Sequence, residues 1–176
     1  MLILLCLGLL AKFVTATLPN TSQIQTFVNT HNYYRSIVSP STSYMPPMSW
    51  SPNLALGSNN WAAQCSWSHS NTPNVGENLY ATTTRTPNPA NFSPVPAVNL
   101  WGGERWYYNY ATNTCAAGHV CGHYTQMVWS NSVNLGCAFQ DCPAISGLPW
   151  PQGGTLVVCQ YSPKGNTVGM KPYCRF

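Results

Sequence analysis

The chain has 176 residues, of which 44% are hydrophobic and only 6% are charged. This length and apolar content suit one domain with a sizeable core, and they exclude a disordered chain. The net charge of +4 reflects a scarcity of acids, because seven Lys and Arg stand against three Asp and Glu, namely Glu77, Glu104 and Asp141. No run of basic residues occurs, so nucleic-acid binding and a polybasic membrane patch are not expected.

The N-terminus has the pattern of a secretory signal peptide. Residues 2–10 form an apolar run, and Val14-Thr15-Ala16 resembles a signal peptidase site. A membrane anchor is the alternative, but the run is shorter than the roughly 20 residues that a spanning helix requires, and Lys12 interrupts it. We expect residues 1–16 to be removed, and residues 17–176 to form one domain of a secreted protein.

Four helical segments are predicted in chain order. Thr21 or Ser22 can cap a helix whose apolar positions, at three and four spacing, reach Val38, with His31 on its inward face as a buried, hydrogen-bonded core histidine. Ser51-Pro52 starts a second helix that ends near Cys65. A third helix is expected over residues 96–108, and a short turn over 123–129. Between the second and third helices, residues 81–96 read as an irregular surface loop without a packed element.

The last third of the chain reads as strands. Residues 134–140 alternate in polarity, and residues 155–161 are rich in β-branched side chains. Helices followed by strands indicate an α+β domain with a small antiparallel sheet.

The cysteines and sequons fit an extracellular protein. Cys6 leaves with the signal peptide and seven cysteines remain, so one is expected to be unpaired. Cys115 and Cys121 enclose a loop short enough for a local bridge, and Cys174, close to the end of the chain, is the natural candidate for the odd thiol. Asn20 and Asn91 begin glycosylation sequons, and Pro94 after the second sequon disfavours its use.

Four residues could carry chemistry together. His69, Glu77, Glu104 and His123 come from separate segments, and imidazole and carboxylate groups are common ligands of divalent metals. Their spacing matches no local ligand motif, so a buried His–Glu network that orders loops remains the alternative. The Gly-x-Ser-x-Gly and His-Glu-x-x-His signatures are both absent.

Four segments resemble the CAP superfamily of cysteine-rich secretory proteins, antigen 5 and pathogenesis-related 1 proteins. They are His31-Asn-Tyr-Tyr-Arg35, Gly76-Glu-Asn-Leu-Tyr80, Gly122-His-Tyr-Thr-Gln-Met-Val-Trp129 and Val158-Cys-Gln-Tyr-Ser-Pro-Lys-Gly-Asn166. Other stretches, such as Met48-Ser-Trp50, most resemble the animal peptidase inhibitor 16 and glioma pathogenesis-related branch.

The resemblance implies a fold and a site. The fold is an α-β-α sandwich, with a three-stranded antiparallel sheet between helical layers. The site is a cleft tetrad of His69, Glu77, Glu104 and His123, in which the two histidines bind zinc or another divalent cation weakly. The resemblance also implies the bridges Cys65–Cys142, Cys137–Cys159 and Cys115–Cys121. A monomer is expected, with an unpaired Cys174 that permits a disulfide-linked dimer, and no cysteine-rich C-terminal domain.

The resemblance favours a secreted binding module over an enzyme. Its ligand would be a sterol, another lipid or an extracellular protein, with a role in defence or signalling. The 81–96 loop, with Phe92 and Val95, is the candidate lipid-binding segment. A metal-dependent hydrolase with Glu77 or Glu104 as general base is one alternative. Protease inhibition is another, and it rests on a family name alone.

Overall fold

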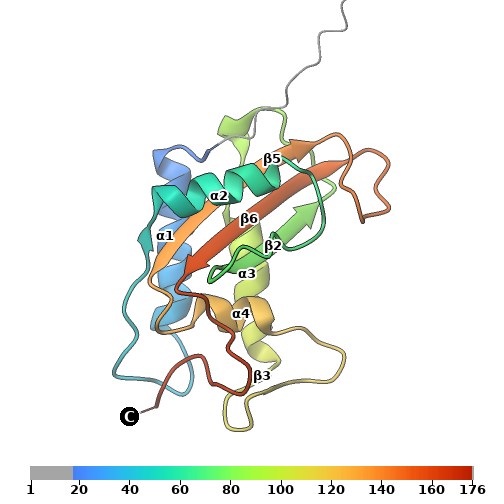
Figure 1. Ribbon diagram of the computed structural model, residues 1–176. Helices are drawn as coiled ribbons and strands as arrows, with labels where there is room; N and C mark the ends of the chain where they lie inside the picture. Colours follow the sequence, from blue (N-terminus) through green and yellow to red (C-terminus); the bar gives the residue numbers. More distant parts are fainter. Residues whose placement is uncertain (1–17, 176) are drawn as a thin grey trace, which may run out of the picture.

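The computed structural model describes residues 18–175, so the predicted signal peptide at residues 1–16 lies outside the described part (Figure 1). Its helices are α1 (Thr21–Ser36), α2 (Pro52–Ala62), α3 (Val95–Gly103) and α4 (Gly122–Met127), with 3-10 turns η1 (Pro89–Asn91) and η2 (Glu104–Trp106). Its strands are β1 (Ser49–Trp50), β2 (Gly76–Thr82), β3 (Tyr108–Asn109), β4 (Thr114–Cys115), β5 (Asn134–Cys142) and β6 (Gly154–Ser162). Within residues 18–175, no helix combines the length and hydropathy that crossing a membrane requires.

The main sheet has the strand order β1-β5-β6-β2. Strands β5, β6 and β2 are antiparallel neighbours and form the expected three-stranded sheet. The two-residue strand β1 adds a parallel edge to β5. A separate two-stranded sheet joins β3 and β4.

Both faces of the sheet are covered by helices, which confirms the α-β-α sandwich. Helix α2 packs on β5 and β6 from one side, while α1, α3 and α4 pack together on the other (Figure 1). The side chains of β6 alternate accordingly, because Val157 and Tyr161 join the core under α1, α3 and α4, whereas Leu156 and Val158 join the core under α2. A strand that is buried on both faces reads as a continuous apolar run, as this segment does.

Caps explain where the first two helices begin. The cap of α1 is Asn20 rather than the predicted Thr21 or Ser22, because its side chain forms a reciprocal capping box with Gln23. Ser51 caps α2 as expected, with Pro52 at the first helical position. Helix α2 lies very close to β5, since a Cβ added at Gly136 would stand only 2.1 Å from the backbone nitrogen of Ala55. Glycine at position 136 therefore allows the α2 layer to approach the sheet.

A buried arginine joins the end of α1 to the end of α4. The Arg35 side chain is only 1% exposed. Its guanidinium donates hydrogen bonds of 2.6 to 3.1 Å to backbone carbonyls of Pro46, Met127, Trp129 and Ser130. Burial lowers its pKa to about 10, so the group stays charged and is neutralised by carbonyl dipoles at the carboxyl end of α4.

Two predictions about the region before α4 were wrong. The segment 81–96 is not irregular throughout, because β2 continues to Thr82, η1 forms within the segment and α3 begins at Val95. The third helix ends at Gly103 rather than continuing to residue 108, and a 3-10 turn follows. Consecutive glycines at 102 and 103 weaken the helix at that point.

Three disulfides link these layers, with the pairings that the resemblance implies. Cys65–Cys142 joins the segment after α2 to the end of β5, Cys137–Cys159 joins β5 to β6, and Cys115–Cys121 closes the loop before α4. Cys174 is free and exposed.

Candidate functional site: two His–Glu pairs

The first pair joins the loop after α2 to the start of β2. The Nδ1 atom of His69 lies 3.0 Å from Oε1 of Glu77, and the same oxygen accepts a hydrogen bond from the Ser70 backbone. The second oxygen of Glu77 accepts from Nε2 of Gln160. Burial acts to raise the pKa of Glu77, but these hydrogen bonds outweigh it and the pKa lies below its ordinary value. The hydrogen bond that His69 donates to Glu77 in turn raises the pKa of His69.

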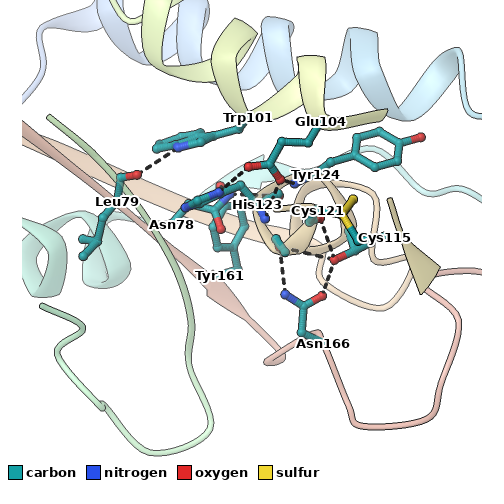
Figure 2. A network of polar contacts seen from close by, with 12 residues as sticks. Asn78, Leu79, Trp101, Glu104, Cys115, Cys121, His123, Tyr124, Tyr161 and Asn166 are labelled. Carbon is teal, nitrogen blue, oxygen red and sulfur yellow. Dashed lines mark hydrogen bonds and ion pairs between the residues drawn. A yellow bond between two sulfur atoms is a disulfide. The ribbon is translucent and has the colours of Figure 1, made fainter. Parts of the chain in front are cut away.

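The second pair lies at the N-terminus of α4 (Figure 2). The Nδ1 atom of His123 is 2.5 Å from Oε1 of Glu104. The other oxygen of Glu104 accepts hydrogen bonds of 3.0 Å from the backbone N–H groups of His123 and Tyr124. Cys121 supplies no side-chain cap to α4, so Glu104 acts as its cap from another segment of the chain. Glu104 therefore fixes both the helix terminus and the imidazole that the helix carries.

A buried chain of hydrogen bonds supports His123 from behind. Asn78 donates to the backbone carbonyl of His123 at 3.0 Å and to the hydroxyl of Tyr161 at 3.1 Å (Figure 2). The Tyr161 hydroxyl lies 2.9 Å from Nε2 of His31, and Nδ1 of His31 lies 2.7 Å from the Phe27 carbonyl. A carbonyl only accepts, so Nδ1 carries the hydrogen and Tyr161 donates to Nε2.

His31 is thus the buried, hydrogen-bonded core histidine that the sequence predicted, with a fully buried side chain. Burial, together with a smaller effect of the charge on Arg35, lowers its pKa to about 4 despite the opposing hydrogen bond to Phe27. The neutral imidazole is consequently part of the frame behind the site and stays uncharged at physiological pH.

A cavity of about 320 Å³ lies beside the first pair, and its wall includes His69, Glu77, Gln126 and Asn166. Gln126 is buried, donates to Ser132 and accepts from the Gly165 backbone at 3.1 Å. A Cβ at Gly76 would lie 2.1 Å from the Gln126 side-chain oxygen, so the start of β2 passes directly over this amide. The wall of the cavity therefore includes a buried amide, Gln126, as well as His69 and Glu77.

The two pairs lie on elements that contact each other, namely β2 and α4. The cavity beside His69 and Glu77 is not lined by Glu104 or His123. Within residues 18–175, no group of three or more His, Cys, Asp or Glu side chains is arranged to hold a metal ion. The arrangement is thus two separate His–Glu pairs on adjoining elements.

Residues outside the predicted tetrad complete the site. Asn78, Gln126, Gln160 and Asn166 all lie within the motifs that carried the resemblance, yet they are ordinary amides in the sequence. A chain with three acids must satisfy buried imidazoles and backbone groups with amides instead. The shortage of acidic residues is the one signal in the sequence that could have identified these amides as part of the site.

The predicted lipid-binding segment is anchored to the core. The ring of Phe92 stacks on Phe139 at 3.8 Å, and Gln23 donates to the carbonyls of Pro89 and Phe92. Val95 is 39% exposed at the start of α3. Of the two predicted contacts, only Val95 presents substantial surface to solvent.

Both predicted glycosylation residues are exposed. Asn20 caps α1 through its side-chain oxygen, which leaves the amide nitrogen outside the capping contact, and Asn91 ends η1.

Comparison with known proteins identifies the family. A model described as CAP, the cysteine-rich secretory protein family, matches residues 28–161. The chain belongs to the CAP family. Pathogenesis-related protein 1 of Arabidopsis thaliana is 41% identical over 175 residues, which cover 97% of this chain and 95% of that protein. Peptidase inhibitor 16 of Mus musculus, from the animal branch, is 40% identical over 164 residues. This match covers 90% of this CAP chain but only 32% of the mouse protein, so the chain spans about a third of that relative's length.

Solved structures support the same assignment. The structure of NaASP2 with Zn²⁺ superposes with a TM-score of 0.74 at 26% identity, covering 90% of this chain and 88% of that one. The structure of Na-ASP-1 gives a TM-score of 0.76 at 25% identity, covering 94% of this chain and 45% of that one. The sandwich described above is therefore the CAP fold.

Proposed function

We propose that this CAP protein is a secreted binding protein whose two His–Glu pairs bind a divalent cation such as zinc. The observation that carries the proposal is that the imidazole has the same orientation towards its carboxylate in both pairs. In each pair the carboxylate engages Nδ1 of the imidazole, so Nε2 is the nitrogen left to bind a ligand. Carboxylates hold metal-binding histidines in this way in known sites, where they fix the tautomer and raise the basicity of the ligand.

The donor set fits a weakly held cation. His69 and His123 would supply two neutral nitrogen ligands, which suit zinc, and the remaining positions would be filled from solvent or by a bound molecule. The His69 side chain is 57% exposed, so solvent has access to it. A structural zinc site would instead have four protein ligands. When bound, the cation would supply a Lewis-acidic point for an anionic or carbonyl group of a ligand.

Both glutamates already serve as acceptors in the protein frame. Glu77 accepts from His69, Ser70 and Gln160, and Glu104 accepts from the His123 side chain and from two backbone N–H groups. A general base needs a free lone pair directed at its proton. This engagement favours binding over the hydrolase alternative.

A calorimetric zinc titration tests the proposal. It uses the Cys174→Ser background, so that the free thiol does not bind zinc. We expect binding at pH 7.5, its loss in the His69→Ala, His123→Ala double variant, and weaker binding at pH 5.5, where histidines become protonated. The matched control is His119→Ala, which removes an exposed histidine that stacks on Tyr107 instead.

The outcomes are distinct. Binding that survives in the double variant, or that falls equally in His119→Ala, would overturn the assignment of His69 and His123. Absence of binding to the parent protein would overturn the metal proposal itself.

Secretion is the setting in which this function would operate. Three disulfides require an oxidising compartment, and the name of the family describes secretory proteins. The relatives include proteins named pathogenesis-related, which supports a role in defence. Expression of the full chain, followed by N-terminal sequencing of protein from the medium, tests both secretion and cleavage after Ala16.

Sterol or lipid binding through the 81–96 segment stays a prediction, which a labelled sterol can test. Phe92 is held by Phe139, so replacing it would disturb the core rather than the loop. The informative variants are therefore Val95→Ser and replacement of residues 83–88. Sterol binding that both variants leave unchanged would exclude this segment.

A further inference from the structure

Strand β3 and the C-terminal segment lie near each other at one end of the molecule (Figure 1). Residues from both line a large groove. We call it the aromatic groove, and its walls come from residues within 106–111 and 170–175, together with Ser39 and Pro40. Its volume is about 1110 Å³, and it shares no lining residue with the cavity beside His69. Most small-molecule pockets measure roughly 300–1,000 Å³, so the groove suits a short oligomer better than a single small molecule.

The two walls of the aromatic groove are tied to each other. The Tyr110 hydroxyl donates to the Tyr173 carbonyl at 2.7 Å, and the two rings stack at 4.7 Å. Asn113 donates to the Met170 carbonyl at 3.1 Å, which connects the β3–β4 sheet to the C-terminal segment. The groove is therefore formed before any ligand arrives, which lowers the conformational cost of binding.

Exposed aromatic rings stand along the groove. Trp106 is 76% exposed and Tyr107 is 42% exposed, although burying such large apolar surfaces would be favourable. The Arg105 guanidinium lies 4.4 Å from the centre of the Trp106 ring and holds it from one side. Flat rings of this kind stack against the C–H faces of sugar rings, while neighbouring hydroxyl and amide groups can bond to sugar hydroxyls.

The groove is also positively charged. Lys171 and Arg175 line the groove. Arg105 lies beside the groove, because its guanidinium contacts the ring of Trp106, which is a lining residue. All three acids are engaged elsewhere, with His69, His123 and Arg85 respectively. Among residues 18–175, no carboxylate lies within ion-pair distance of these three basic side chains. Lys171 instead donates to the Ala111 carbonyl and sits over the Tyr110 ring.

We propose that the aromatic groove binds an acidic oligosaccharide, a short chain of sugar rings that carries carboxylate or sulfate groups. Such a ligand matches both the exposed rings and the basic side chains, which form charge-assisted hydrogen bonds with carboxylate or sulfate. A nucleic acid presents a phosphate at every nucleotide and is held by a denser set of cations than three. The site is independent of the proposed metal function.

Fluorescence and calorimetric titrations test the proposal with defined probes. The probes are a galacturonate hexamer, a heparin hexasaccharide and a neutral glucose hexamer, added to the full mature chain with Cys174→Ser. We expect at least one acidic probe to bind, in a salt-dependent manner, and the neutral hexamer to bind far more weakly. Heparin carries sulfate in addition to carboxylate, so much tighter binding of the heparin probe than of the galacturonate hexamer would indicate recognition of sulfate, and comparable binding would indicate that carboxylate suffices.

Matched variants locate the site. We expect Trp106→Ala and Lys171→Gln each to weaken binding roughly tenfold, with Trp106→Tyr recovering part of the loss. The controls are Trp67→Ala and Lys164→Gln, an exposed tryptophan and an exposed lysine outside the groove, and they should change binding less than about twofold. Binding should also persist in the double histidine variant, so failure of the zinc proposal would leave this one standing.

Four results would overturn the inference. They are failure of both acidic probes to bind, equal binding of the neutral hexamer, tighter binding of a single-stranded oligonucleotide, and control variants that lose as much affinity as the groove variants. Circular dichroism of each variant establishes that it is folded before its affinity is interpreted.

Discussion

Two substitutions of Glu104, to Ala and to Gln, test whether this side chain caps helix α4. In Glu104→Ala the backbone N–H groups of His123 and Tyr124 lose their acceptor, and the His123 imidazole loses its partner. Loss of an N-cap costs about 1–2 kcal/mol, and the bond to the partly buried imidazole adds about 1–2 kcal/mol. The total is about 2–4 kcal/mol of the free energy of unfolding. The melting temperature should then fall by roughly 6–12 °C for a domain of this size.

Glu104→Gln is the matched variant. Its amide oxygen can still accept from both backbone groups, whereas its amide nitrogen takes the place of the oxygen that accepts from His123 Nδ1 and cannot accept that bond. Loss of the charge itself costs about 1 kcal/mol at a helix N-terminus. Thermal melting measures the two stabilities, and hydrogen exchange reports the His123 and Tyr124 amides individually. Those amides should lose protection in Glu104→Ala and keep it in Glu104→Gln. Equal melting temperatures for the two variants, with unchanged protection of both amides, would refute the capping argument.

Three further predictions concern the frame. Gly136→Ala places a Cβ 2.1 Å from the Ala55 nitrogen and should cost about 1–3 kcal/mol in urea unfolding, whereas Gly103→Ala, which meets nothing within 4 Å, should cost little. Because the pKa of His31 is lowered to about 4, its stabilising effect is full above pH 6.5 and is lost as the pH falls towards 4. The free energy of unfolding should fall by about 3 kcal/mol over this range, and a His31→Gln variant should lack that pH dependence. An equal slope of unfolding free energy against pH in both proteins would disprove this role of His31. Arg35→Met should destabilise by about 3 kcal/mol or more, because four carbonyls lose their buried donor, and Arg35→Lys should recover part of this in the same unfolding measurement.

Local signals in the sequence predicted much of the fold. Ser51 and Pro52 predicted the start of α2, and the start of α1 was predicted to within two residues although its cap is Asn20. Strands β5 and β6 follow from apolar and β-branched runs. Strand β2 gave no such signal, because Glu77 and Asn78 are polar residues that the finished fold satisfies through distant partners. Its existence depended on the family resemblance.

The four tetrad residues could be selected from the sequence by scarcity and by motif, but their contacts could not. Glu104 caps a helix that begins eighteen residues later, and only the folded chain brings the two segments together. The same holds for the aromatic groove, since Arg105, Lys171 and Arg175 are scattered in the sequence and form no basic run. Contacts between distant segments carry no periodic signal that a single sequence can reveal.

The small number of acidic side chains, all of which have partners, affects how the stability of this protein depends on acidic pH. Acid unfolds most proteins because many carboxylates with native partners must take up protons. Here only three side chains of that kind exist, and hydrogen bonds hold the pKa of Glu77 below its ordinary value, as Arg85 does for Asp141. Between neutral pH and pH 5 few carboxylates are therefore available to take up protons, and the sensitivity of this protein to acid is instead concentrated at the buried imidazole of His31.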